Sequence, residues 1–71
     1  MRNIIYLDNE PDDLKYIQQA IGGYIEVIMM EDGRIMYVNE DGKFLNLEIN
    51  SDATAIMGYP IYGTVIITKQ N

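Results

Sequence analysis

The sequence contains no cysteine and no histidine. Without cysteine the chain forms no disulfide, and without either residue type it lacks the usual ligands of a structural zinc site. A Ser–His or Cys–His pair for nucleophilic catalysis is excluded for the same reason. The only serine, Ser51, is better explained as a helix-cap residue. We therefore expect a protein that is not an enzyme and that needs no metal and no cofactor.

Basic side chains are also scarce, with 5 lysines and arginines against 11 acidic residues and a net charge of −6. Binding to a phosphate backbone needs clustered positive charge. Here the basic residues are scattered singly, at Arg2, Lys15, Arg34, Lys43 and Lys69. We therefore expect no direct contact with nucleic acid. The acidic surface indicates either a protein partner with a basic surface or simply solubility.

Long apolar runs are absent as well. No run approaches the roughly 20 residues that a membrane span needs. Residues 1–15 lack a basic start followed by an apolar stretch, so we expect no signal peptide and a cytoplasmic location. The 71 residues are enough for a single domain, 1–71. A core this small is often supplemented by a partner chain. With disulfides and zinc excluded we expect a homodimer, formed either through an edge strand or through a sheet face that carries tyrosine and methionine.

Hydrophobic periodicity predicts the secondary structure. Strands are expected at 4–7, 24–30, 34–39, 44–49 and 64–68, a helix at about 12–21, and a short helical turn at 53–57. The fold class is therefore α+β, with a small, curved, mostly antiparallel sheet of four or five strands and one covering helix, in the order β-α-β-β-β-(short helix)-β. The last strand lacks alternation, which favours a central position buried on both faces.

Turn and cap residues agree with this order. Gly22-Gly23 ends the helix, Asp32-Gly33 predicts a hairpin between the second and third strands, and Asn50 or Ser51 caps the short helical turn. The expected core consists of Leu7, Leu14, Ile17, Ile21, Ile25, Val27, Val38, Leu45, Leu47, Val65 and Ile67.

The acidic segment at residues 8–13 suggests two kinds of site, and both fail. The alternation of Asp8, Glu10 and Asp12 is similar to a calcium-binding EF-hand loop, but Asp13 replaces the required glycine and Gln19 the required glutamate. The segment is also similar to the acidic pocket of a receiver domain, whose remaining elements need a longer chain. A helix cap explains these residues fully.

Two acidic hairpin tips and several tyrosines are the candidate contact residues. The tips, Glu31-Asp32 and Glu40-Asp41, are turn residues first, and they lie at opposite ends of one expected strand, too far apart for a two-carboxylate active site. Tyrosine is enriched at interfaces, and we expect at least two of Tyr16, Tyr24, Tyr59 and Tyr62 to be partly exposed. The candidate partner-binding residues are Glu31, Asp32, Glu40, Asp41, Tyr24, Tyr59 and Tyr62.

An ordered set of short motifs resembles a known family. The motifs are Gly22 to Val27, Tyr37 to Lys43, Asn50 with Ala53-Thr54, and Ile61 to Ile67. Together with the preceding strand and helix they resemble the domain of unknown function 3846, found in bacteriophages, prophages and plasmids. The sequence departs from the family at residues 47–50, where a proline-containing segment is expected. The resemblance implies a mobile-element origin in a bacterial host and no functional residues.

Two functions from different classes follow. The first is a small phage- or mobile-element-encoded interaction protein that inhibits a host defence system, as an anti-CRISPR protein does, by binding a basic surface of its target. The alternative is an oligomeric module that binds a small ligand such as a nucleotide signal, with Arg34 or Lys43 of several chains gathered at an interface. An accessory structural role without a ligand remains open beside them.

Overall fold

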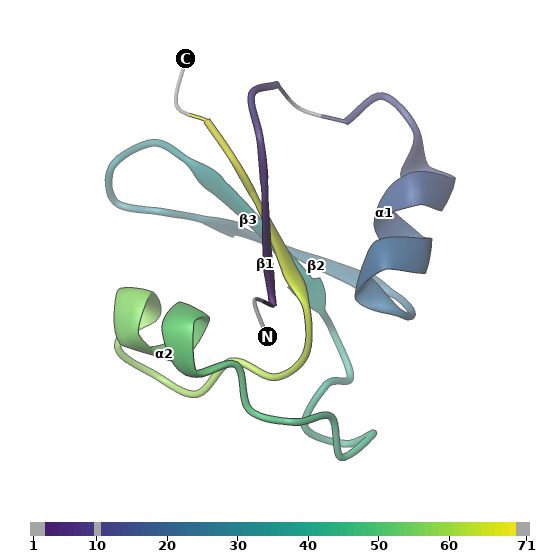
Figure 1. The fold of residues 1–71 in the computed structure, drawn as a ribbon, viewed down its shortest axis with the longest axis vertical. Helices are drawn as coiled ribbons and strands as arrows, with labels where there is room; N and C mark the ends of the chain where they lie inside the picture. Colours follow the sequence, from purple (N-terminus) through teal and green to yellow (C-terminus); the bar gives the residue numbers. More distant parts are fainter. Residues whose placement is uncertain (1–2, 10, 70–71) are drawn as a thin grey trace.

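The computed structural model describes residues 3–9 and 11–69, so Arg2 and Glu10 lie outside the described part. The chain folds as an α+β domain around a four-stranded sheet, which confirms the predicted fold class. The elements are β1 (Ile4–Leu7), α1 (Leu14–Ile21), β2 (Ile25–Met29), β3 (Ile35–Asn39), α2 (Ser51–Met57) and β4 (Val65–Thr68) (Figure 1).

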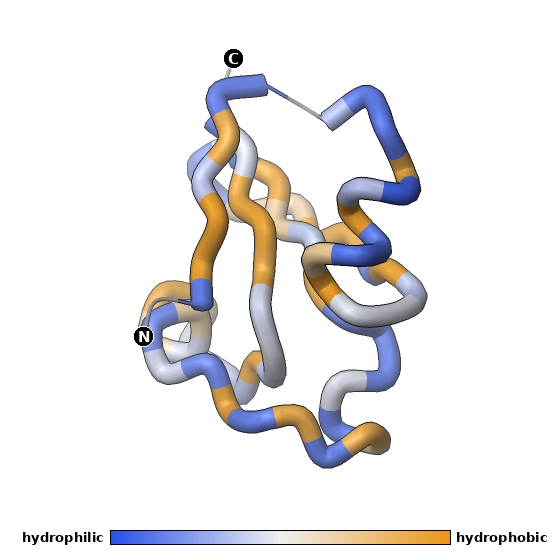
Figure 2. Tube along the Cα trace, turned by 45° about the vertical axis from the view of Figure 1, so that its right-hand side comes forward, coloured by the Kyte–Doolittle hydropathy of each residue, from blue (hydrophilic) through white to orange (hydrophobic). Residues whose placement is uncertain are grey.

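The strands follow one another across the sheet in the order β1-β4-β3-β2. β1 runs parallel to β4, whereas β4 and β3, and β3 and β2, pair antiparallel. The sheet is thus mostly antiparallel, and β2 and β3 form the predicted hairpin. Every residue of β4 is buried, which confirms its predicted central position. Figure 2 shows most of β4 as a hydrophobic stretch beside β1.

The two faces of the sheet carry separate hydrophobic clusters. On one face Ile17 and Ile21 of α1 pack against Ile66, with Ile5 and Tyr37 beside them. The hydrophobic cluster on the other face is larger, and α2 and the segment after it cover that face. Its buried residues are Met30, Met36, Val38, Ala53, Ile61, Val65 and Ile67. Instead of one covering helix, the domain therefore has a helix on each face, α1 on one and the short α2 on the other.

Both helices begin and end at capping residues. The side chain of Asp13 accepts a hydrogen bond from the backbone N–H of Lys15, and that of Asn50 from the backbone N–H of Ala53. Gly22 and Gly58 end the helices in the left-handed conformation, with φ of 88° and 79°. The helix expected at about 12–21 thus starts at Leu14, because Asp13 is its N-cap. Of the two expected cap residues of the short helix, Asn50 is the N-cap and Ser51 is the first helical residue.

The strand expected at 44–49 is reduced to one antiparallel bridge between Ile49 and Tyr62. Residues 40–46 form turns instead, closed by hydrogen bonds such as that from the Leu45 N–H to the Asp41 carbonyl. Asn46 takes a positive φ of 58°, which asparagine tolerates. The reason is topological, since both sides of β3 are already paired, one with β2 and the other with β4.

Three residues expected in the core are exposed: Leu14, Val27 and Leu45. Leu14 lies in the first turn of α1, whose contact with the sheet is made one and two turns later by Ile17 and Ile21. Val27 lies on edge strand β2, beyond the reach of α1. Leu45 lies in the 40–46 turns. The core instead includes five residues that the sequence did not single out: Met30, Met36, Ala53, Ile61 and Ile66.

Of the part of the chain that the structure describes, neither helix has the length and apolar character that crossing a membrane requires.

Candidate functional site

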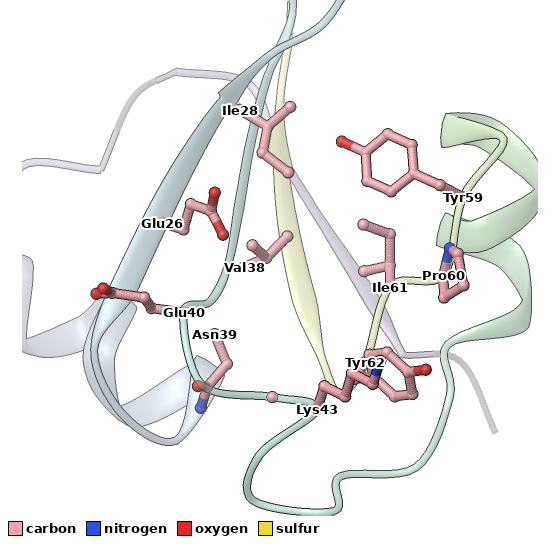
Figure 3. Close-up of a pocket in the computed structure, with 11 residues that line it drawn as sticks. Glu26, Ile28, Val38, Asn39, Glu40, Lys43, Tyr59, Pro60, Ile61 and Tyr62 are labelled. Atoms are coloured by element: carbon pink, nitrogen blue, oxygen red, sulfur yellow. The ribbon is translucent and has the colours of Figure 1, made fainter.

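The hairpin of β2 and β3 and the segment after α2 enclose a hollow of about 220 Å³. Ile28, Val38 and Ile61 give it an apolar lining (Figure 3). Tyr59 reaches across the hollow towards Ile28, and Glu26 points its carboxylate into the hollow from β2. The opening is therefore apolar at its base and carries a carboxylate and a phenol at its rim.

A second hollow, of about 550 Å³, adjoins the first towards the hairpin tip. It shares Ile28 and Tyr59 with the first hollow. Its other lining residues are Met29, Met30, Glu31, Asp32, Arg34, Ile56 and Met57. We call the two hollows together the Tyr59 groove. It runs along the β2–β3 hairpin, from Glu40 just after β3 to the Glu31-Asp32 turn just before β3.

The wall that carries the tyrosines is tied to α2 by hydrogen bonds. The backbone N–H of Ile61 donates to Thr54 Oγ1 at 2.9 Å, and the Asn50 N–H donates to the Ile61 carbonyl at 2.7 Å. These bonds fix the backbone between Tyr59 and Tyr62 relative to α2, so the wall stands at a set distance from the sheet.

The end of the groove near Glu40 and Tyr62 depends on the absence of a side chain at Gly42. A Cβ at this position would lie 3.1 Å from the Tyr62 Cβ and 3.1 Å from the Tyr62 carbonyl oxygen. The 40–46 turns therefore approach the backbone at Tyr62 more closely than any other residue at position 42 permits without movement. This contact brings Glu40 and Lys43 to the same hollow as Tyr62.

Carboxylates outnumber cations along the groove. Glu26 and Glu40 line the first hollow with Lys43, and Glu31 and Asp32 line the second with Arg34. Arg34 Nε donates to Asp32 Oδ2 at 2.8 Å. The backbone N–H of Arg34 also donates to Asp32. This backbone bond, together with the side-chain bond, holds the pKa of Asp32 below its usual value. With Arg34 and Asp32 paired, three glutamates face one lysine.

The structure brings together most of the candidate residues predicted from the sequence. Glu40 and Tyr62 line the first hollow, Glu31 and Asp32 the second, and Tyr59 both. The two acidic tips lie at opposite ends of β3, as predicted. The remaining two candidates are not among the groove-lining residues: Asp41 lies in the adjoining turn, and Tyr24 is highly exposed just before β2.

Sequence reasoning missed Glu26 and the apolar base of the groove, and it considered Lys43 only as a ligand contact gathered between several chains. Glu26 alternates with Ile25 and Val27 on β2, so it was interpretable as an outward residue of a strand. What the sequence does not show is that the 59–62 segment returns to face it. Tyr16, Tyr24 and Tyr59 are exposed, which agrees with the expectation for the tyrosines.

The groove combines carboxylates, phenols and apolar side chains. Within residues 3–9 and 11–69, no three acidic side chains are grouped closely enough to hold a metal ion. The groove offers carboxylates for cationic groups, phenols for hydrogen bonds and stacking, and an apolar base.

The family model for the domain of unknown function DUF3846 matches residues 3–71. The chain belongs to this family. The match covers the sheet, both helices and the groove, so the family resemblance carried by the short motifs is confirmed. No curated protein and no solved structure matches the chain.

Proposed function

We propose that this DUF3846 protein is a small interaction protein that binds a basic surface of another protein through the Tyr59 groove. The observation that supports the proposal is the excess of glutamates around an aromatic and apolar opening, with Glu26, Glu31 and Glu40 beside Tyr59. The net charge of −6 favours the approach of a basic partner.

The apolar and aromatic parts of the groove suit a protein partner better than a simple ion. Protein interfaces combine an aromatic or apolar centre with a polar rim, and tyrosine and arginine contribute much of their binding energy. An arginine of the partner fits this groove on two counts, since its guanidinium stacks on Tyr59 and pairs with Glu26. Arginine-rich surfaces are typical of proteins that bind nucleic acid.

The proposed target is a nucleic-acid-binding surface of a host defence protein, such as a CRISPR nuclease. The family resemblance implies a mobile-element origin, and an acidic protein that occupies a basic groove competes with nucleic acid for it. The proposed mechanism is steric and electrostatic occupation without catalysis, in the bacterial cytoplasm. It needs no cofactor and no contact between this chain and nucleic acid.

Capture from a bacterial host lysate with three forms of the protein tests the proposal. The natural chain and a charge-matched control should retain one partner, and a groove variant should lose it. The groove variant is Glu26→Lys with Glu40→Lys, and the control is Asp12→Lys with Glu48→Lys, whose carboxylates are exposed outside the Tyr59 groove. Both variants change the net charge equally, so a difference reports on the groove.

With the captured protein purified, the groove variant should weaken binding on the order of tenfold and reduce its salt dependence. Added duplex DNA or RNA should compete with the natural chain. Both variants should unfold within about 0.5 kcal/mol of the natural chain, because the changes lie on the surface. Equal binding by the groove variant and the control, or a partner indifferent to nucleic acid, would contradict the proposal.

A second candidate function, binding of a small anionic ligand, has one observation in its favour. Tyr6, Arg34 and Lys69 line a hollow of about 230 Å³ at the ends of β1 and β4. Two cations and an aromatic ring suit a nucleotide. However, Asp8 lines the same hollow and Arg34 is already paired with Asp32.

A thermal-shift screen with mononucleotides and cyclic nucleotides tests this second candidate. If the hollow binds one of them, the Tm should rise with ligand concentration, as mass action requires. Arg34→Gln should then abolish the rise, and Lys43→Gln, outside this hollow, should keep it. No shift with any nucleotide at millimolar concentration would remove this candidate.

A further inference from the structure

Strand β2 forms one edge of the sheet, and its outer side is unpaired within the described residues. The Met30 N–H donates to the Arg34 carbonyl, and the Glu40 N–H donates to the Tyr24 carbonyl, so the peptide groups of even-numbered residues point to β3. In an antiparallel pair these directions alternate. The peptide groups of Ile25, Val27 and Met29 therefore point outward and are available to another strand.

The side chains on this edge offer little protection against pairing. Val27 and Met29 lie on the face that α1 covers only as far as Ile25 and Tyr37, and both are largely exposed. Edge strands that remain unpaired usually carry lysine, proline or a bulge. β2 has none of these devices, and its one charged residue, Glu26, projects from the opposite face.

We infer that β2 pairs antiparallel with β2 of a second copy, across a two-fold axis at Val27. This register lets all five residues of each strand overlap. It places Val27 opposite Val27 and Ile25 opposite Met29, so the exposed Val27 and Met29 side chains gain apolar neighbours. It also places Glu26 opposite Ile28 instead of opposite a second carboxylate.

The neighbouring registers are worse for stated reasons. An axis at Glu26 sets the two Glu26 side chains directly opposite each other, and like charges in that position are destabilising. An axis at Ile28 pairs only three residues of each strand and leaves Ile25 beyond the overlap. A slip of one residue in the pairing turns the apolar side chains to the wrong face. The strand is thus self-complementary in one register, which identifies a second copy as its occupant.

The charge of the chain sets the salt dependence of this dimer. Two copies of net charge −6 repel each other, and the two Glu26 carboxylates lie diagonally across the axis. Screening shortens such repulsion to about 8 Å at physiological ionic strength. Added salt should therefore strengthen the dimer, the opposite of its effect on a basic partner. The paired sheet carries both Tyr59 grooves on the same face.

Light scattering and sedimentation of the protein alone test the inference. The natural chain at tens of micromolar should have twice the 8.2 kDa chain mass. Val27→Lys places two lysines opposite each other and should raise the dimer dissociation constant at least about tenfold. Tyr6→Lys is the matched control on the other edge, strand β1, because Tyr6 is 59% exposed and Val27 is 55% exposed. The control should remain dimeric.

A cysteine variant covers the case in which Val27→Lys does not fold. The sequence has no cysteine, so Val27→Cys introduces a single thiol at the axis. Facing residues of paired strands lie at a Cα separation of about 5.5 Å, within the range of a disulfide. Mild oxidation should crosslink Val27→Cys and leave Tyr6→Cys as single chains.

Three results would overturn the inference. These are a monomeric mass for the natural chain, dissociation by Tyr6→Lys in place of Val27→Lys, and the absence of a Val27→Cys crosslink. A monomeric natural chain would leave the β2 edge to a strand of another protein. None of these measurements includes the partner of the Tyr59 groove, so they stand or fall separately from the proposed function.

Discussion

Replacing Asn50 by aspartate should lower the free energy of unfolding by about 3–5 kcal/mol, the cost of a buried charge without a counter-charge. Asn50 is 1% exposed. Its amide Nδ2 donates to the Asn3 carbonyl at 2.9 Å and to the Gly63 carbonyl at 2.8 Å, while its Oδ1 caps α2. An aspartate at position 50 keeps the oxygen that caps α2. Its second carboxylate oxygen replaces the Nδ2 donor and faces the carbonyl oxygens of Asn3 and Gly63 without a hydrogen bond. Domains of this size are stabilised by only roughly 4–10 kcal/mol, so the variant should be marginally folded.

The pH dependence of this variant has a definite sign. Burial beside two carbonyl oxygens disfavours the ionised carboxyl at position 50, so its pKa in the folded state is raised above the ordinary value of about 3.9. A raised pKa makes the deficit largest at neutral pH, and the deficit shrinks as the pH falls through the folded-state pKa. Urea unfolding of both proteins at neutral pH and near pH 5 measures this difference.

Asn9→Asp is the control for Asn50→Asp, because it adds the same charge at an exposed position. Its cost should stay within about 0.5 kcal/mol at both pH values. If Asn50→Asp were as stable as Asn9→Asp, the amide bonds to Asn3 and Gly63 would not hold the two segments together.

Truncating Ile66 to alanine should cost about 3 kcal/mol, near the middle of the range for buried aliphatic side chains. Ile66 is 0% exposed on central strand β4, where it contacts Ile17 and Ile21 of α1. The change removes the centre of the cluster that holds α1 on the sheet. At roughly 4–8 °C per kcal/mol for a domain of this size, the Tm should fall by about 12–24 °C.

The control for Ile66→Ala is Leu14→Ala, since Leu14 belongs to the helix on the same face but is 61% exposed. Its loss should change stability by less than about 0.5 kcal/mol. Thermal unfolding of both variants, monitored by circular dichroism, measures the two losses of Tm. A larger effect of Leu14→Ala would mean that α1 packs through its first turn, as the helical repeat of the sequence predicts.

The order of elements was predictable because local signals agree with the fold. Asp32-Gly33 marks the hairpin, Gly22 ends α1, and Asn50 caps α2. The uninterrupted apolar run of β4 correctly predicted a central strand. These signals act within a few residues, so they do not depend on the rest of the chain.

The errors came from facts that only the assembled sheet determines. Leu45 and Leu47 alternate as strand residues do, yet both sides of β3 were already paired, and the segment turned instead. Val27 lies on a face that α1 is too short to cover. The sequence indicates only part of the Tyr59 groove, namely its acidic tips and tyrosines. Glu26 belongs to the groove because residues 59–62 lie opposite β2, and no local pattern in the sequence predicts that contact.

The pairing of β1 with β4 has a consequence for the time course of folding. Ile4 pairs with Val65, so β1 forms its sheet hydrogen bonds only after β4, near the other end of the described chain, has been synthesised. Both hydrophobic clusters also contain β4 residues, Val65 and Ile67 in one and Ile66 in the other. During translation β1, α1 and the hairpin emerge before β4, whose residues complete both clusters. Such non-local pairing slows folding. Until β4 is synthesised, the nascent hairpin can contact chaperones or the hairpins of other copies of the chain.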